Sequence, residues 1–216
     1  MRVFDVMAAG VANALRERLL SLSFEDGSET AGNGARPVKA NRQLTIRSRA
    51  ATPLLQDVRA RLMGCSPLCI YILPRDIVTI MFNQYGPGEA YGWHTDNPYI
   101  EGKRTDVSFT LFLTDPEDYE GGELEIRHKG GVASFKGRAG QAVVYSTGDL
   151  HRVTPVTRGS RVSAVGWITS WVGLDADRET LFEMQQELTR LAGKVGLDEI
   201  EPLSRLYQKI SKRLSC

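Results

Sequence analysis

Histidine and cysteine are both scarce in this chain, with three residues of each among 216. The cysteines, Cys65, Cys69 and Cys216, form an odd set whose spacing suits neither a disulfide framework nor a zinc site. Pro67 lies between the first two and argues against a helix that would place their thiols one turn apart. We therefore expect free, structural thiols in a reducing cytoplasm.

An excess of either charge is also missing, since 27 lysine and arginine residues stand against 26 aspartate and glutamate residues. The net charge of +1 provides no general attraction to nucleic acid or to an anionic membrane. A local basic patch is the remaining alternative. The apolar stretch within residues 1–20 is short and interrupted by charged residues, so it resembles neither a signal peptide nor a membrane span. We expect a cytoplasmic chain that binds neither nucleic acid nor membrane.

Internal repeats, low-complexity tracts and heptad patterns are absent too, and the composition is that of an ordinary globular chain with one main domain. Val11, Leu15 and Leu19 share a helical face and predict an amphipathic helix over roughly the first 20 residues, with Asp5 as a candidate cap. Residues 25–43 have no apolar period and are rich in Gly, Asn and Ser. They predict a long loop or a frayed sheet edge, of the kind that serves as a lid.

From residue 70 onward the sequence changes to short β-rich runs, separated by turn clusters such as GPG at 86–88 and TRGS at 157–160. The predicted strands cover residues 77–85, 107–113, 122–127, 132–135, 142–146 and 161–172. Short strands without intervening helices indicate an antiparallel sandwich or barrel and exclude a βαβ fold.

The last part of the chain is helical in pattern. Two apolar faces recur at helical spacing, one made of Leu181, Met184, Leu188 and Leu191 and the other of Leu203, Leu206, Ile210 and Leu214. They predict a hairpin over residues 173–216, as an extension to a main domain over residues 1–172. We expect its apolar faces to pack on the sheet or on each other, and the alternative is partner binding, including oligomerisation through these helices.

Two of the histidines lie where a metal site is expected. His94 and Asp96 are two residues apart, so in an extended segment both side chains point the same way. His151 follows a predicted strand that an antiparallel fold readily places beside an earlier one. Two imidazoles and one carboxylate on one face of an octahedron are the ligand set of Fe(II) centres that activate O₂. His128 lies among charges before a glycine pair and reads as an exposed turn.

Arg161 opens the strand that follows His151. Arg161, Ser163, Val165 and Trp167 alternate onto one face, which we expect to be the interior. A guanidinium that faces the interior is costly unless an anion meets it, and a dicarboxylate co-substrate would supply that anion with bidentate geometry.

Three segments carry a resemblance to a known family. FNQYGPGEAYGWHTD at 82–96, RTDVSFTLFLTDPEDYEGGEL at 104–124 and GDLHRVTPVTRGSRVSAVGWI at 148–168, together with the helical tail, resemble the Fe(II)/2-oxoglutarate-dependent dioxygenases of the prolyl 4-hydroxylase type, and among them the bacterial PKHD-type hydroxylases. The resemblance covers nearly the whole chain. It implies a mainly β fold with flanking helices: a double-stranded β-helix, or jelly roll, with the N-terminal helix packed on the sheet and a C-terminal helical hairpin.

The resemblance also implies roles for single residues. His94, Asp96 and His151 would bind Fe(II), Arg161 would grip the distal carboxylate of 2-oxoglutarate, and Tyr85 would donate a hydrogen bond to that co-substrate. Ascorbate is a candidate reductant. Thr110, on the face of Ser108 and Phe112, is a further candidate for the co-substrate pocket. For Tyr85, as for Trp93 and Trp167 as walls of the site, a plain core position is the alternative.

The implied reaction is hydroxylation of a substrate with release of succinate and CO₂ from 2-oxoglutarate. Halogenation needs the carboxylate ligand to be missing, whereas Asp96 is present. The nucleic-acid demethylases of this fold carry a second arginine six residues after the first, where this chain has Trp167. A non-catalytic jelly roll that senses iron, oxygen or 2-oxoglutarate and binds a partner would keep the same ligands and stays open.

The substrate is the least determined feature. Kinship with prolyl 4-hydroxylases favours a peptide or protein side chain, and a small polar molecule is the alternative. Lys39, Arg42, Arg47 and Arg49 concentrate positive charge at the end of the 25–43 loop, which would favour a polar or acidic substrate beneath a closing lid. Residues 97–104 and the C-terminal helices are the other candidates for choosing it.

Overall fold

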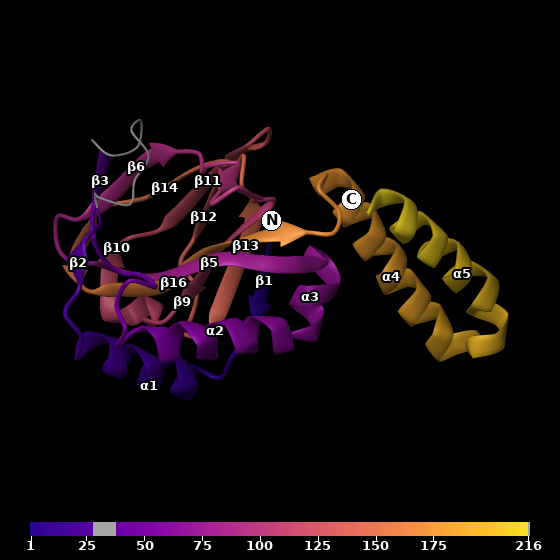
Figure 1. The fold of residues 1–216 in the computed structure, drawn as a ribbon, viewed down its shortest axis with the longest axis horizontal. Helices are drawn as coiled ribbons and strands as arrows, with labels where there is room; N and C mark the ends of the chain where they lie inside the picture. Colours follow the sequence, from indigo (N-terminus) through magenta and orange to yellow (C-terminus); the bar gives the residue numbers. More distant parts are fainter. Residues whose placement is uncertain (28–37, 216) are drawn as a thin grey trace.

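The computed structural model describes residues 1–27 and 38–215, and within them two antiparallel sheets face each other (Figure 1). The larger sheet has the order β1 (Arg2–Asp5), β13 (Gln141–Ser146), β9 (Val107–Phe112), β16 (Arg161–Ser170), β5 (Pro74–Tyr85), β4 (Arg42–Leu44), β2 (Glu25–Asp26). The smaller sheet has the order β12 (Gly131–Phe135), β11 (Leu124–His128), β14 (Leu150–Val153), β6 (Ala90–His94), β3 (Lys39–Ala40). Two open sheets with this crossing order form a jelly roll and not a closed barrel.

The remaining described elements are short strand pairs and helices. The strand pairs are β7 (Tyr99–Ile100) with β8 (Lys103–Arg104), and β10 (Tyr119–Gly121) with β15 (Val156–Gly159). The helices are α1 (Ala9–Leu20), α2 (Thr52–Gly64), α3 (Ser66–Ile72), the 3-10 turn η3 (Pro116–Asp118), α4 (Asp175–Val195) and α5 (Leu197–Leu214). The predicted strands are all present, with bounds that differ by a few residues.

A layer of helices covers the outer face of the larger sheet (Figure 1). Leu15 and Leu19 of α1 and Val58 of α2 are buried in one apolar cluster with Phe82 and Leu111 of the sheet. Burying such side chains contributes about 1.5–3 kcal/mol each to folding. The expectation that the N-terminal helix packs on the sheet is confirmed.

The prediction that this helix begins near the first residue, capped by Asp5, is wrong. Residues Arg2–Asp5 form β1, which pairs with β13 in the register Phe4↔Ala142. Asp5 lies opposite Gln141, whose side-chain amide donates to the Asp5 carboxylate at 2.9 Å, and α1 begins at Ala9 without a side-chain cap. The N-terminal segment extends the larger sheet because β13 would otherwise present an unpaired edge.

The interpretation of Pro67 as a helix breaker is also wrong. Pro67 occupies the first turn of α3, where no intrahelical partner for its missing N–H is required. Cys69 therefore lies within α3 and Cys65 directly precedes it, and both thiols are free. Both residues are partly buried and pack against the main apolar cluster, which agrees with structural thiols.

The predicted 25–43 loop lies partly outside the described residues. Its described ends form β2, β3 and the start of β4 at the sheet margins, which agrees with a frayed edge. Residues 28–37, the middle of the proposed 25–43 lid, lie outside the described residues, so the lid stays a prediction.

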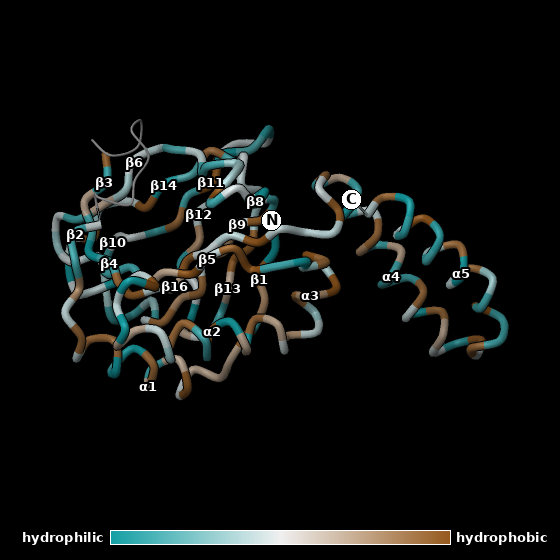
Figure 2. The backbone as a smooth tube through the Cα atoms, viewed as in Figure 1, coloured by the Kyte–Doolittle hydropathy of each residue, from teal (hydrophilic) through white to brown (hydrophobic). Residues whose placement is uncertain are grey.

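Two long helices, α4 and α5, end the described chain and form the predicted hairpin (Figure 1). They pack on each other, and α4 also contacts α3. The hairpin stands away from the two sheets. Phe182 of α4 meets the Tyr71 ring edge-on at 5.2 Å, and Arg2 lies over the Phe182 ring at 4.4 Å. Hydrophobic and hydrophilic positions alternate along both helices (Figure 2). Within residues 1–27 and 38–215, no helix is both long and apolar enough to cross a membrane.

Candidate metal and co-substrate site

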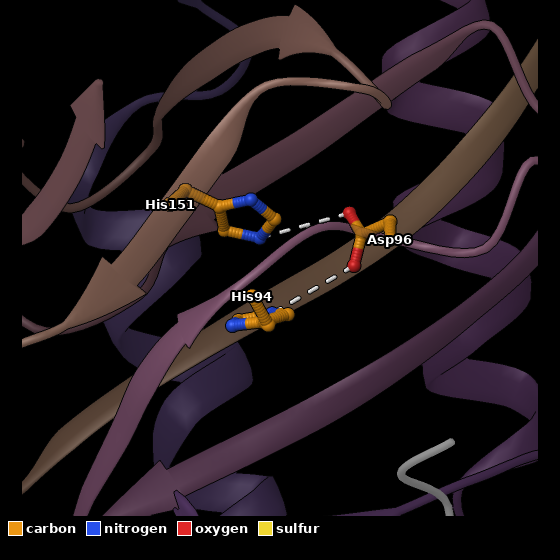
Figure 3. Close-up of side chains that lie close together, drawn as sticks. All are labelled: His94, Asp96 and His151. Atoms are coloured by element: carbon orange, nitrogen blue, oxygen red, sulfur yellow. Dashed lines mark ion pairs between the residues drawn. The ribbon is translucent and has the colours of Figure 1, made fainter. Parts of the chain in front are cut away.

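Neighbouring strands of the smaller sheet bring the predicted metal ligands together. β14 pairs with β6 so that His151 lies directly opposite His94, and Asp96 follows two residues after the end of β6. The three side chains converge (Figure 3). One ligand atom of each lies within 4.8 Å of the others, with 3.8 Å between His94 Nε2 and Asp96 Oδ1 and 3.7 Å between His151 Nε2 and Asp96 Oδ2. These three residues are called the triad below.

An irregularity in β6 sets which residues face the interior. His151 pairs with His94 and Val153 pairs with Tyr91, so β6 has three steps where β14 has two. An extra residue of this kind is a β-bulge, and it turns Tyr91 and His94, three apart, to the same side. The Tyr91 ring stacks on the His94 imidazole, with 3.6 Å between centroids and 17° between planes. The ring orientation of His94 is therefore fixed by packing.

Backbone carbonyls fix the tautomers of both histidines. His94 Nδ1 donates to the Gly92 carbonyl at 2.8 Å, and His151 Nδ1 donates to the Asp149 carbonyl at 2.9 Å. A carbonyl only accepts, so each Nδ1 carries the proton and each Nε2 lone pair points to the centre of the triad. Burial, together with His151, lowers the pKa of His94 to about 4, which keeps it neutral at ordinary pH. Neutral imidazoles oriented in this way are competent metal ligands.

The carboxylate of the triad is oriented by a serine from the opposite sheet. Ser108 Oγ donates to Asp96 Oδ2 at 2.7 Å, and Ser108 also lies 3.2 Å from Thr147 Oγ1. Sequence reasoning placed Ser108 only on the face of Thr110 and gave it no role. Its contact with Asp96 joins residues 12 apart on facing sheets, which no local pattern indicates.

Arg161 lies in the same interior, at the start of β16. Its side chain is among the most deeply buried in the described chain, with 1% exposure. Nη1 donates to Ser163 Oγ at 2.9 Å, but Nε and Nη2 have no hydrogen-bond partner among the described residues. A buried guanidinium without an anion is costly, and two donors without partners match the geometry of a carboxylate. The predicted inward face of β16 is confirmed, since Arg161, Val165 and Trp167 line one cavity.

The other predicted co-substrate residues surround Arg161. Tyr85 lies directly opposite Arg161 in the β5–β16 pairing, with the guanidinium 5.3 Å from its ring centroid. Burial raises the pKa of Tyr85 to about 12, so its hydroxyl remains a donor. Thr110 lines the same cavity, as does Tyr145, whose ring meets His151 edge-on at 4.9 Å. Tyr145 and Tyr91 were missed by sequence reasoning because buried aromatics in strands usually indicate only a core.

A cavity of about 600 Å³ connects the triad with Arg161. Its wall includes Lys39 from β3 and Trp167 from β16, and from the 97–104 segment it includes Asn97 and Ile100. This size lies within the usual range for small-molecule sites. Trp93 also borders the cavity, and the guanidinium groups of Arg127 and Arg152 lie 4.6 and 4.7 Å from the centroid of its ring.

The remaining histidine does not belong to this site. His128 ends β11 and is exposed, and its Nδ1 accepts from the Gly130 amide at 3.1 Å in the turn to β12. The expectation of an exposed turn at His128 is confirmed.

The fold and this site define a class of protein. The family model of the 2OG-Fe(II) oxygenase superfamily matches residues 80–169, which include β6, β14 and nearly all of β16. Within that superfamily, the chain belongs to the PKHD-type hydroxylases. A PKHD-type hydroxylase of Picosynechococcus sp. is 40% identical over 195 residues, covering 90% of this chain and 89% of the relative. Another, from Acidovorax ebreus, is 39% identical over 217 residues and covers 97% and 96%.

Solved structures share the fold at lower identity. A Pseudomonas putida prolyl-4-hydroxylase matches with a TM-score of 0.56 at 22% identity, covering 78% of this chain and 91% of that one. HygX from Streptomyces hygroscopicus, solved with nickel and 2-oxoglutarate bound, matches with a TM-score of 0.55 at 15% identity, covering 78% and 82%. The predicted jelly roll is thereby confirmed. The protein is an oxidoreductase of the hydroxylase type, and its cofactors are Fe(II) and 2-oxoglutarate.

Proposed function

We propose that the triad binds the Fe(II) and that Arg161 binds the distal carboxylate of 2-oxoglutarate in the same cavity, so that the enzyme hydroxylates a substrate and releases succinate and CO₂. The observation that carries this proposal is the buried guanidinium of Arg161, whose Nε and Nη2 have no hydrogen-bond partner within residues 1–27 and 38–215, in a cavity that also holds the triad. A dicarboxylate whose keto acid end reaches the metal would satisfy both ends at once.

In this proposal, separate residues bind the metal and the co-substrate. The iron supplies the oxidising chemistry when it is bound, with 2-oxoglutarate and O₂. His94 and His151 offer Nε2, and Asp96, held by Ser108, offers a carboxylate oxygen. Tyr85 and Thr110 are proposed to hydrogen-bond the co-substrate beside Arg161. The buried surroundings exclude bulk water from the reacting atoms, which limits side reactions.

The substrate is proposed to be polar or acidic, either a peptide or protein side chain or a small polar molecule. Lys39 lines the cavity and stands 5.1 Å from the Tyr91 ring, and burial lowers its pKa to about 8. The indole N–H of Trp167 is buried without an acceptor among the described residues, so it is available to a substrate oxygen. Of the cations that the sequence grouped near residue 40, Lys39 reaches the cavity, whereas Arg42, Arg47 and Arg49 are exposed.

Two further expectations remain proposals. We propose that residues 1–172 form the catalytic domain and residues 173–216 a helical extension, supported by the hairpin standing away from the sheets. We also propose that the protein works in the cytoplasm, supported by the free thiols of Cys65 and Cys69.

The experiment that tests the proposed function is turnover of 2-oxoglutarate by the purified protein with Fe(II), O₂ and ascorbate. Succinate should accumulate with the wild type, and offering acidic and polar peptides should accelerate it and yield a product heavier by one oxygen. His151→Ala and Arg161→Met should form no succinate above background. A protein that binds 2-oxoglutarate and iron stoichiometrically but forms no succinate with any peptide or small polar molecule would instead be the sensor.

A further inference from the structure

The outer helix of the C-terminal hairpin has an apolar stripe that the described chain leaves uncovered. Leu203, Leu206 and Ile210 recur at helical spacing and are 47%, 52% and 37% exposed. Other positions of α5, which packs on α4, are less exposed, including the buried Ile200 and the half-buried Tyr207. One side of α5 is therefore buried or half-buried, and a second side is apolar and exposed.

Charged residues close this stripe at both ends, and they have opposite signs. Glu199 lies four residues before Leu203 and Arg213 lies three after Ile210, so both continue the same face. Both are exposed, and neither has an ion pair among the described residues. The wider helix has the same polarity, since its first turn holds Asp198 and Glu199 and its last turn holds Lys212 and Arg213.

The stripe is complementary to itself when it is turned end for end. Glu199 lies seven residues before Leu206, and Arg213 lies seven residues after it. In an antiparallel pair of α5 helices with Leu206 on a two-fold axis, each Glu199 faces the Arg213 of the other copy, and the leucines cover each other. A parallel pair would place like charges together. An isologous contact of this kind is the usual geometry of homodimers.

We propose that α5 is a dimerisation helix and that its partner is the α5 of a second copy of this chain, antiparallel and centred on Leu206. The helix has 18 residues and is about 27 Å long at about 1.5 Å per residue. A contact of that length buries less than the roughly 800 Å² per partner of a standard interface, so the dimer dissociates on dilution. The hairpin stands away from the sheets that hold the triad, so this contact is separate from the triad (Figure 1).

Sedimentation velocity of the full-length protein over about 1–200 µM tests this contact. The wild type should change from monomer to dimer in that range, while Leu206→Asp should stay monomeric with unchanged circular dichroism, since Leu206 is half exposed. Gln208→Asp is the matched control, because Gln208 lies on the opposite side of α5, and it should dimerise like the wild type. A wild type that is monomeric throughout, or a Leu206→Asp variant that associates normally, would overturn the proposal.

Charge exchange tests the orientation. Glu199→Arg alone and Arg213→Glu alone each place like charges opposite each other twice, and each should weaken the homodimer by about tenfold. Mixing the two single variants should produce heterodimers, and the double variant Glu199→Arg/Arg213→Glu should recover wild-type association. If the double variant is as weak as the single variants, the antiparallel register is wrong. Turnover of 2-oxoglutarate should be the same in all of them, so this result is independent of the proposed function.

Discussion

At the triad end of the cavity the protein satisfies its own polar atoms, whereas at the Arg161 end it leaves them open. Each imidazole donates through Nδ1 to a carbonyl, and Asp96 accepts from Ser108. Arg161 has Ser163 as a partner for Nη1 and none among the described residues for Nε and Nη2. Under the proposed assignment, the difference means that the metal site is prepared in advance, whereas the co-substrate supplies the missing partner at the Arg161 end. The two ends should therefore fail separately when they are altered.

The largest effect is expected from His151→Ala. Loss of one of three ligands removes the open-faced metal site, so bound iron or manganese should fall below detection and succinate formation should drop by about 1,000-fold or more. His128→Ala removes the exposed histidine and should change neither metal content nor turnover. Metal analysis after loading and desalting measures both variants, and full occupancy in His151→Ala would remove His151 from the site.

The next largest effect is expected from Arg161→Met, which keeps an unbranched stem and removes the charge. Removing one partner of a buried ion pair costs about 3–5 kcal/mol, so the Kd for 2-oxoglutarate should rise by about 100-fold or more. Metal binding should stay near the wild-type value. Arg161→Lys should fall between the two, because an ammonium lacks the bidentate fork. Equilibrium dialysis with labelled 2-oxoglutarate decides this, and an unchanged Kd in Arg161→Met would place the co-substrate elsewhere.

A smaller effect is expected from removing the serine that contacts each end of the cavity. Ser108→Ala removes the donor to Asp96 and should weaken metal binding by about tenfold, as is typical for residues that orient a ligand. Ser163→Ala removes the partner of Arg161 and should weaken 2-oxoglutarate binding by about fivefold without affecting the metal. Titrations of Mn(II) and of 2-oxoglutarate into each variant should show weaker metal binding in Ser108→Ala and weaker 2-oxoglutarate binding in Ser163→Ala. The same loss in both variants for both ligands would mean that the two ends are not separable.

The smallest effect concerns Lys39, which borders the cavity. Its pKa is lowered to about 8 mainly by burial, while the Asp96 carboxylate favours the charged form. Lys39 should thus lose its proton as the pH rises through about 8, and Asp96→Asn should shift that midpoint further down. Carbon-13 NMR of labelled lysine in the metal-free protein measures this, with Lys39→Arg to assign the signal. A midpoint near 10.5, the ordinary value, would show that Lys39 is solvated and does not face the cavity.

Sequence patterns predicted the features that arise from local periodicity. Alternation and turn residues located β5, β9, β13 and β16 of the larger sheet and β11 and β12 of the smaller one, but not β6 and β14, which hold His94 and His151. The spacing of His94, Asp96 and His151 indicated a metal site, and the structure brings the three side chains together. The bulge that brings Tyr91 onto His94 depends on the register between β6 and β14, which neither segment encodes alone.

The errors have similar physical causes. Arg2–Asp5 became a strand because β13 offered an edge, so tertiary pairing decided the structure of a short polar segment. Helices α2 and α3 were not predicted, and Pro67 was taken as a breaker although a first-turn proline fits a helix. Ser108 and Lys39 gained their surroundings from contacts between distant segments. Such contacts follow from the fold and not from the neighbouring sequence.

The central claim, that one cavity holds the metal at one end and a carboxylate at the other, is tested most directly by calorimetry under anaerobic conditions. We would titrate 2-oxoglutarate and glutarate, which lacks the keto group, into the protein with and without Fe(II). The account predicts that Fe(II) strengthens binding of 2-oxoglutarate and leaves glutarate unchanged, because glutarate contacts Arg161 alone. Binding of 2-oxoglutarate that is indifferent to Fe(II), or glutarate binding that depends on it equally, would contradict the account.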